Sequence, residues 1–143
     1  MNPTPAAAPP QPFRKGLFTL PGPDGSPGHL MGNRCRECAA IYFPPRQICA
    51  RCMKDGILEA LPLSRRGTLY TYTVIRQAPP RYEVPYAVGY VDLPEGIRVF
   101  AQIEGWQERE LAVGEPMEVF FTTLREDEQR GKLLGYRFRP VDP

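Results

Sequence analysis

The sequence predicts a mainly β protein with three parts: an N-terminal arm, a rubredoxin-like four-cysteine metal ribbon and a C-terminal barrel of five strands. Two observations carry this prediction. All four cysteines lie between residues 35 and 52, in two Cys-x-x-Cys pairs. After residue 66, short segments rich in β-branched and aromatic residues alternate with turns that contain proline or glycine. We expect the three parts at residues 1–30, 31–62 and 63–143.

The arm is rich in proline and glycine. Eight of the 18 prolines lie in the first 27 residues, a composition typical of extended or poorly ordered chain. Four apolar residues allow one short amphipathic turn that docks on another surface, with an unstructured tail as the alternative: Phe13, Leu17, Phe18 and Leu20. The start of the chain has neither the basic residues nor the apolar core of a signal peptide. We therefore expect a cytoplasmic protein, without a membrane segment.

The cysteines are spaced as two metal-binding knuckles, formed by Cys35 with Cys38 and by Cys49 with Cys52. Two intervening residues let both thiolates reach one ion while backbone N–H groups turn toward the sulfurs. Two knuckles then complete a tetrahedral shell around Zn²⁺. Disulfides, a redox pair or another metal are the alternatives. The sequence predicts a structural zinc ion and leaves no cysteine as a nucleophile.

Five strands are expected after the ribbon, at residues 67–76, 86–92, 97–103, 117–123 and 133–138. Residues 93–96 supply proline and glycine for a hairpin loop, and Gly89 marks a bend or bulge. Residues 104–114 have room for one short helix. Five short strands suit the small Greek-key barrel called the OB-fold, and a small sandwich is the competing architecture.

Few residues suit catalysis. His29, the only histidine, lies among glycines and prolines with no nucleophile in its context. The carboxylates are scattered and do not form an acid–base pair. Trp106, the only tryptophan, is either a core residue or an anchor for a partner. We expect no catalytic residues in this chain, so the nucleophile and base of any reaction must come from another chain.

Basic and acidic residues are distributed unevenly along the chain. Residues 34–66 hold seven basic and three acidic residues, whereas residues 67–143 hold nine basic and twelve acidic ones. The basic ribbon suits phosphate groups of a nucleic acid or a cofactor, or it is an ordinary solvated surface. Three barrel aromatics, Tyr70, Tyr72 and Tyr90, suit base stacking. Because the barrel is acidic, nucleic acid is the alternative partner and not the expected one.

Several motifs follow one another in a specific order: the two knuckles, Tyr42-Phe43-Pro44-Pro45-Arg46 between them, and LSRRGTLYTYTV at residues 63–74. GEPMEV at 114–119 and YRFRP at 136–140 continue the series. This order resembles the family of zinc-ribbon and OB-fold proteins that associate with acyl-CoA enzymes. The resemblance covers about residues 30–140. Two departures are Ala39, where the family has glycine, and an arm without the helix of many relatives.

The resemblance implies a non-catalytic subunit of a hetero-oligomer, whose thiolase-like partner cleaves or forms a carbon–carbon bond in an acyl-CoA. The OB domain would pack on this partner and help enclose the acyl-CoA, while residues 43–46 shape the seam between ribbon and barrel. The expected partner interface comprises Phe43, Pro44, Pro45, Tyr82 and Trp106. Arg46, Arg65 and Arg66 are expected to contact CoA phosphates, because guanidinium groups match phosphate oxygens. Salt bridges to the partner, or to Glu37 and Glu59, are the alternative.

Overall fold

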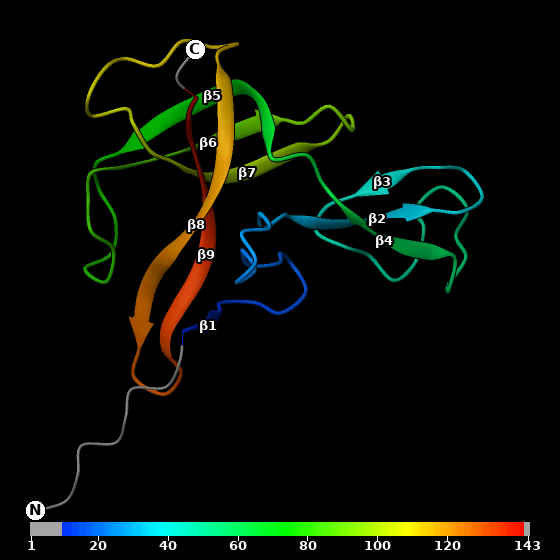
Figure 1. Ribbon diagram of the computed structural model, residues 1–143. Helices are drawn as coiled ribbons and strands as arrows, with labels where there is room; N and C mark the ends of the chain where they lie inside the picture. The colour runs from blue at the N-terminus through cyan, green and yellow to red at the C-terminus, as the bar shows by residue number, and fades with distance from the viewer. Residues whose placement is uncertain (1–9, 142–143) are drawn as a thin grey trace, which may run out of the picture.

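The computed structural model describes residues 10–141; part of the predicted arm (1–9) and residues 142–143 lie outside the described residues. Between residues 10 and 141 the chain forms strands and turns and no helix, as the mainly β prediction requires. Figure 1 shows the barrel, the smaller ribbon beside it and the N-terminal segment below. The strands are β1 (Gln11–Pro12), β2 (Met31–Cys35), β3 (Ile41–Tyr42), β4 (Leu58–Pro62), β5 (Arg66–Ile75), β6 (Tyr86–Asp92), β7 (Arg98–Ile103), β8 (Pro116–Asp127) and β9 (Gly131–Pro140).

Strands β5 to β9 close into a five-stranded barrel. β5, β6 and β7 are antiparallel neighbours, β7 pairs in parallel with β9, and β9 pairs with β8. β8 then returns to β5, where Gly67 faces Met117 and closes the ring. The OB-fold is confirmed, and the competing sandwich is wrong, because a closed ring of strands has no second sheet to pack against.

The last two strands are longer than the sequence predicted, and they form a hairpin that extends beyond the barrel in Figure 1. The Asp127 carboxylate accepts the backbone N–H groups of Gln129 and Arg130 at 2.8 and 2.9 Å. This Asx-type turn reverses the chain within three residues. Arg125, Glu126 and Lys132, which lie between the predicted strands 117–123 and 133–138, therefore belong to β8 and β9.

Two local expectations are wrong. Residues 104–114 form turns instead of a helix, since Gly105 has a φ of 90° and the Glu115 carboxylate holds the loop by accepting the Ala112 N–H at 3.0 Å. Gly89 is not a bulge. The bulge lies on β5, between Leu69 and Thr71. Gly89 instead allows close strand contact, because a Cβ there would lie 2.3 Å from the Thr71 carbonyl oxygen.

The described part of the arm docks on the barrel. β1 pairs in parallel with β9, and the Arg130 guanidinium donates to the carbonyls of Pro12 and Phe13 at 3.0 and 3.3 Å. Phe18 is buried, and its ring stacks on Phe121 with centroids 5.2 Å apart. Leu17 is also buried, whereas Leu20 is exposed. Docking of this segment is thus confirmed, and the unstructured alternative is wrong for residues 10–30.

The ribbon is a three-stranded sheet in the order β3-β2-β4, joined to the barrel through a common core. Leu30 and Leu63, at the two ends of the ribbon, are almost fully buried in the cluster that fills the barrel. The Phe43 ring contacts Tyr136 of β9 edge-on at 5.9 Å, so Phe43 lies at the predicted seam. None of the described residues forms a helix long and apolar enough to cross a membrane.

Candidate metal centre and surrounding surface

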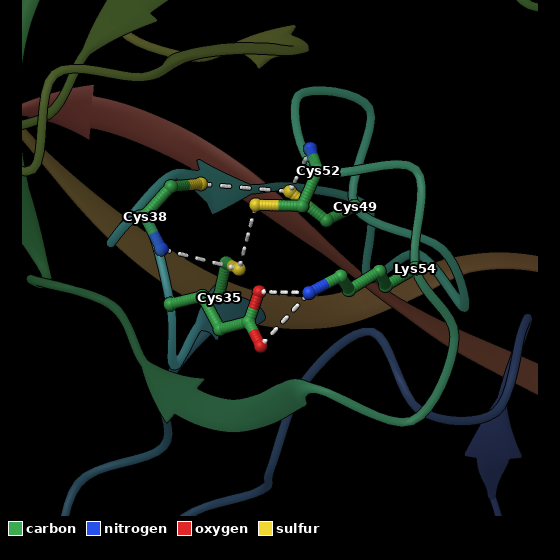
Figure 2. A network of polar contacts seen from close by, with 6 residues as sticks. Cys35, Cys38, Cys49, Cys52 and Lys54 are labelled. Carbon is green, nitrogen blue, oxygen red and sulfur yellow. Dashed lines mark hydrogen bonds and ion pairs between the residues drawn. The ribbon is translucent and has the colours of Figure 1, made fainter.

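The four cysteines converge on one point at the end of the ribbon. Their sulfur atoms all lie within 4.8 Å of one another, and all four thiols are free of disulfides. Figure 2 shows the sulfurs facing one another across the gap between the two knuckles. Cys35 and Cys49 are buried, while Cys38 and Cys52 are half-buried. The expected ligand set is therefore assembled in one place, and the disulfide alternative is wrong.

The sulfur geometry matches a tetrahedral ion. Four sulfurs at about 2.3 Å from a central Zn²⁺ are about 3.8 Å apart. Cys35 and Cys52 sulfurs are separated by 3.8 Å, and those of Cys38 and Cys49 by 3.6 Å. Four cysteine ligands complete the coordination of a structural site and leave no position for a reacting water. The centre is thus a structural metal site.

Both knuckles use the same backbone turn. The N–H of the second cysteine points at the sulfur of the first, at 3.5 Å for Cys38 and 3.4 Å for Cys52. The following residue then adopts a left-handed conformation, with φ of 63° at Ala39 and 59° at Met53. Each donates its N–H to the carbonyl of the first cysteine. A glycine would adopt these angles with less strain than alanine or methionine.

Tyr42 of β3 changes the pKa of a thiol in the second knuckle. Its hydroxyl lies 3.4 Å from the Cys49 sulfur and lowers the pKa of the Cys49 thiol to about 6; the same contact raises the pKa of Tyr42. The neighbouring thiols, Cys38 foremost, raise the pKa of Cys52 to about 12. Four crowded sulfurs cannot all ionise without a cation between them, because like charges oppose one another. The electrostatics of the cluster therefore also fit a bound metal.

Charge pairs surround the centre. Lys54 donates to both carboxylate oxygens of Glu37 at 3.0 and 3.3 Å, and Figure 2 shows this ammonium beside the cysteine cluster. This carboxylate raises the pKa of Lys54. Arg36 pairs with Glu59 at 3.9 Å. Glu37 and Glu59 are therefore paired with other residues of the ribbon. They were the alternative partners expected for Arg46, Arg65 and Arg66.

The three arginines expected to contact CoA have different environments. The Arg65 guanidinium already has acceptors within the chain, since it donates to the Gly28 carbonyl at 3.0 Å and to the Glu118 carboxylate at 3.2 Å. The Arg66 side chain is 69% exposed and has one long ion pair, to Glu118 at 3.7 Å. Arg46 is exposed, and its guanidinium lies over the Tyr42 ring, 5.3 Å from the centroid. Glu118 is a partner that sequence reasoning missed, because it lies on β8, 53 residues after Arg65 and 52 after Arg66.

The expected interface residues lie on three separate segments. Pro44 and Pro45 are exposed beside Phe43 on the ribbon. Tyr82 lies in the loop between β5 and β6, where its ring stacks on Tyr86 at 6.4 Å. Trp106 is half-buried against the barrel core. The structure does not gather these side chains into one cluster.

His29 has a structural role. Its Nδ1 lies 3.1 Å from the Leu63 carbonyl oxygen, which accepts a hydrogen bond, so Nδ1 carries the proton. The backbone of His29 also exchanges contacts with Thr19 in the docked arm. This histidine therefore connects the arm to the junction between ribbon and barrel. With the cysteines in the metal site, the chain has no other histidine or thiol for catalysis.

Comparison with known proteins finds two matching family models. Residues 25–59 match the rubredoxin-like zinc ribbon domain of ChsH2, and residues 61–122 match its C-terminal OB-fold domain. A DUF35 domain-containing scaffold protein from Methanocaldococcus jannaschii is 35% identical over 116 residues, covering 79% of this chain and 82% of the relative.

Two further relatives have informative names. Benzoylsuccinyl-CoA thiolase subunit BbsA from Thauera aromatica is 34% identical over 129 residues, covering 90% of this chain and 88% of the relative. Among solved structures, the chain is similar to the Ltp2-ChsH2(DUF35) aldolase. The TM-score is 0.63 with 29% identity, and the match covers 78% of this chain and 84% of that one.

Proposed function

This chain belongs to the ChsH2 family of zinc-ribbon and OB-fold proteins, and on that premise we propose that it is a non-catalytic subunit of a thiolase-superfamily complex. The complex acts on an acyl-CoA by cleaving or forming a carbon–carbon bond. The observation that carries this proposal is the similarity, over 90% of the chain, to a protein named as a subunit of a thiolase. The similarity to a chain of an aldolase assembly agrees with it.

The chemistry of the chain supports a non-catalytic role. Thiolase-type chemistry needs a nucleophile and a proton acceptor within reach of the substrate. All four thiols converge on the metal site, and the single imidazole donates to a backbone carbonyl. The catalytic groups must therefore belong to the partner, and this chain contributes shape and binding surface.

The metal, which we take to be zinc, stabilises the ribbon. Cys35, Cys38, Cys49 and Cys52 would hold it as thiolates, and Tyr42 orients the Cys49 sulfur. A hydrogen bond from a neighbouring side chain to a metal ligand increases metal affinity. The ribbon in turn packs on the barrel through Phe43 and Leu63, so the metal supports the position of the barrel relative to the ribbon.

Two arginines are available for the CoA phosphates. Arg46 and Arg66 are exposed on the basic part of the chain, and each guanidinium can present two N–H groups to one phosphate. Arg65 is held by Gly28 and Glu118, so its guanidinium is less available to a phosphate. In the complex, Phe43, Pro44, Pro45, Tyr82 and Trp106 contribute to the interface with the catalytic subunit. The part boundaries at residues 30 and 62 and the cytoplasmic location stay predictions.

Reconstitution tests the proposal. The chain is purified alone, the thiolase-like protein encoded nearest to its gene is purified alone, and the two are mixed. We expect acyl-CoA turnover to require the thiolase-like protein and to rise at least about tenfold in the mixture. Turnover by the chain alone, or no effect of the chain on its partner, would contradict the proposal.

Single-stranded nucleic acid is less well supported as a ligand. Of the three tyrosines considered for base stacking, Tyr72 points inward: it packs against the core, and its hydroxyl accepts the Leu111 N–H at 3.3 Å. Arg98, beside the two outward rings, is paired with Asp92 at 2.6 Å. A groove for single strands needs unpaired cations along the backbone path.

A further inference from the structure

The outward face of the barrel around β6 is apolar where an exposed face should be polar. Ala87 and Val91 point into the core and the backbone of Gly89 is buried between them, so the alternating residues Tyr86, Val88 and Tyr90 point outward. An antiparallel strand with one face in water normally alternates apolar with polar residues. A strand that is apolar on both faces is typical of sheets that are covered on both sides.

Neighbouring strands extend this apolar face near Tyr90, whereas Val88 lies between Thr73 of β5 and Gln102 of β7. Tyr90 lies opposite Phe100 of β7 in the register, and their rings meet edge-on at 5.3 Å. Tyr70, at the bulge of β5, projects beside them and is 46% exposed; Tyr90 and Phe100 are 41% and 53% exposed. At the other end, Tyr82 stacks on Tyr86. We call the outward side chains of Tyr70, Tyr82, Tyr86, Val88, Tyr90 and Phe100 the aromatic face.

The charge beside the central rings of Tyr70, Tyr90 and Phe100 is balanced, whereas at the other end of the face the Arg81 guanidinium lies over the Tyr82 ring, 5.0 Å from the centroid. Arg98 donates to Asp92 through two hydrogen bonds, at 2.6 and 3.3 Å, and its guanidinium also lies over the Tyr70 ring, 3.4 Å from the centroid. The Asp92 carboxylate therefore neutralises the cation that lies next to the central rings. Such a surface complements an apolar protein surface of low charge and does not complement a polyanion.

We propose that the aromatic face is the docking surface for the thiolase-like catalytic subunit, and that it meets an apolar, weakly charged patch there. This inference rests on the proposed function and adds to it the surface by which the two chains bind. Interface centres are rich in tyrosine and phenylalanine and poor in charge, which is the composition of the central part of this face around Tyr90 and Phe100. The rings are already ordered by stacking and by cross-strand packing, so docking costs little side-chain entropy.

Ring removal tests the docking surface. Tyr90→Thr/Phe100→Thr removes both central rings while keeping residues that favour strands. The matched control, Tyr90→Phe/Phe100→Tyr, keeps both rings and exchanges only the hydroxyl group. Each variant is titrated against the thiolase-like protein by calorimetry, after zinc content and the thermal midpoint have been compared with those of the wild-type chain.

We expect the ring-removal variant to bind at least about a hundredfold more weakly, because anchor rings contribute about a factor of ten or more each, and the exchange variant to bind within about threefold of wild type. Equal binding of wild type and ring-removal variant overturns the docking surface and leaves the proposed function intact. Failure of the wild-type chain to bind overturns both.

A second measurement needs no variant. Hydroxyl-radical labelling of the wild-type complex should protect Tyr90 and Phe100 severalfold relative to the free chain, and unchanged labelling overturns the inference. Two other molecules could cover the aromatic face, a second copy of this chain or a single-stranded nucleic acid. Light scattering on the chain alone detects a homodimer, and titration with a single-stranded oligonucleotide detects nucleic-acid binding. If the face is covered in a homodimer, or if ring removal abolishes oligonucleotide binding and spares subunit binding, the inference is wrong.

Discussion

The hydroxyl oxygen of Tyr42 lies 3.4 Å from the Cys49 sulfur and accepts the backbone N–H of Ala50 at 3.0 Å. Because the amide occupies the oxygen as an acceptor, the hydroxyl hydrogen is available to the sulfur. The contact stabilises the thiolate that a metal requires, and it fixes the second knuckle to strand β3. A tyrosine between the two knuckles thus belongs to the metal site, although it is not a ligand.

Removing this hydroxyl should weaken metal binding. Tyr42→Phe raises the pKa of Cys49 from about 6 toward its ordinary value, since the thiolate loses its main hydrogen bond. Protons then compete better with the metal, so zinc should leave at a higher pH during acidification. We expect about a 10- to 100-fold loss of zinc affinity, measured by competition with a coloured chelator. Tyr82→Phe, which removes a hydroxyl far along the sequence, should leave the affinity unchanged; equal affinities for wild type and Tyr42→Phe would contradict this role.

Glycine in the knuckles should stabilise the protein. Ala39 and Met53 have φ angles of 63° and 59°, and both side chains are exposed, so Ala39→Gly and Met53→Gly relieve strain without losing packing. We expect a gain of about 1 kcal/mol in the free energy of unfolding for each, measured by urea denaturation of the zinc-loaded protein. Ala50→Gly, at an exposed position without a positive φ, should instead be neutral or destabilising. A loss of stability in both knuckle variants would show that the turns are not strained.

The docked arm should contribute to global stability. Phe18 is 7% exposed and stacks on Phe121, so Phe18→Ala leaves a cavity between the arm and β8. We expect the free energy of unfolding to fall by about 3 kcal/mol. Leu20→Ala, at a side chain 42% exposed in the same segment, should cost less than about 1 kcal/mol. Equal effects in urea unfolding would mean that the arm does not pack as described.

Exposed arginines should affect CoA affinity without affecting the fold. We expect Arg46→Ala and Arg66→Ala each to weaken acyl-CoA binding to the complex by about 3- to 10-fold, since each removes a charge-assisted contact. Arg125→Ala, on the distal hairpin, is the matched control. Binding is measured by calorimetry on the assembled complex at two salt concentrations. If neither substitution changes affinity, the phosphate hypothesis is wrong for both residues.

Much of the barrel follows from the pattern of side chains. Residues 86–92 alternate around buried Ala87, Gly89 and Val91, and the predicted strand matches β6 residue for residue. The turn between β8 and β9 was harder to predict, since Arg125, Glu126 and Lys132 look like loop residues. They continue the ladder because Asp127 closes a tighter turn than their charge suggests.

The metal ligands were also predictable, since Cys-x-x-Cys spacing reports directly on local geometry. Contacts between distant segments were not. Arg65 reaches Glu118, 53 residues away, and His29 reaches the Leu63 carbonyl, because the barrel closes and brings these segments together. No local pattern encodes such pairs. The aromatic face was only partly visible for the same reason: inward Tyr72 and outward Tyr70 look alike until the bulge on β5 is known.

Light scattering of the chain mixed with the thiolase-like protein encoded nearest to its gene shows whether the two form one complex. We expect a single hetero-oligomer at micromolar concentration, with about one zinc per copy of this chain. A mixture that stays as two separate species, in which this chain instead binds oligonucleotides with a steep salt dependence, would contradict it.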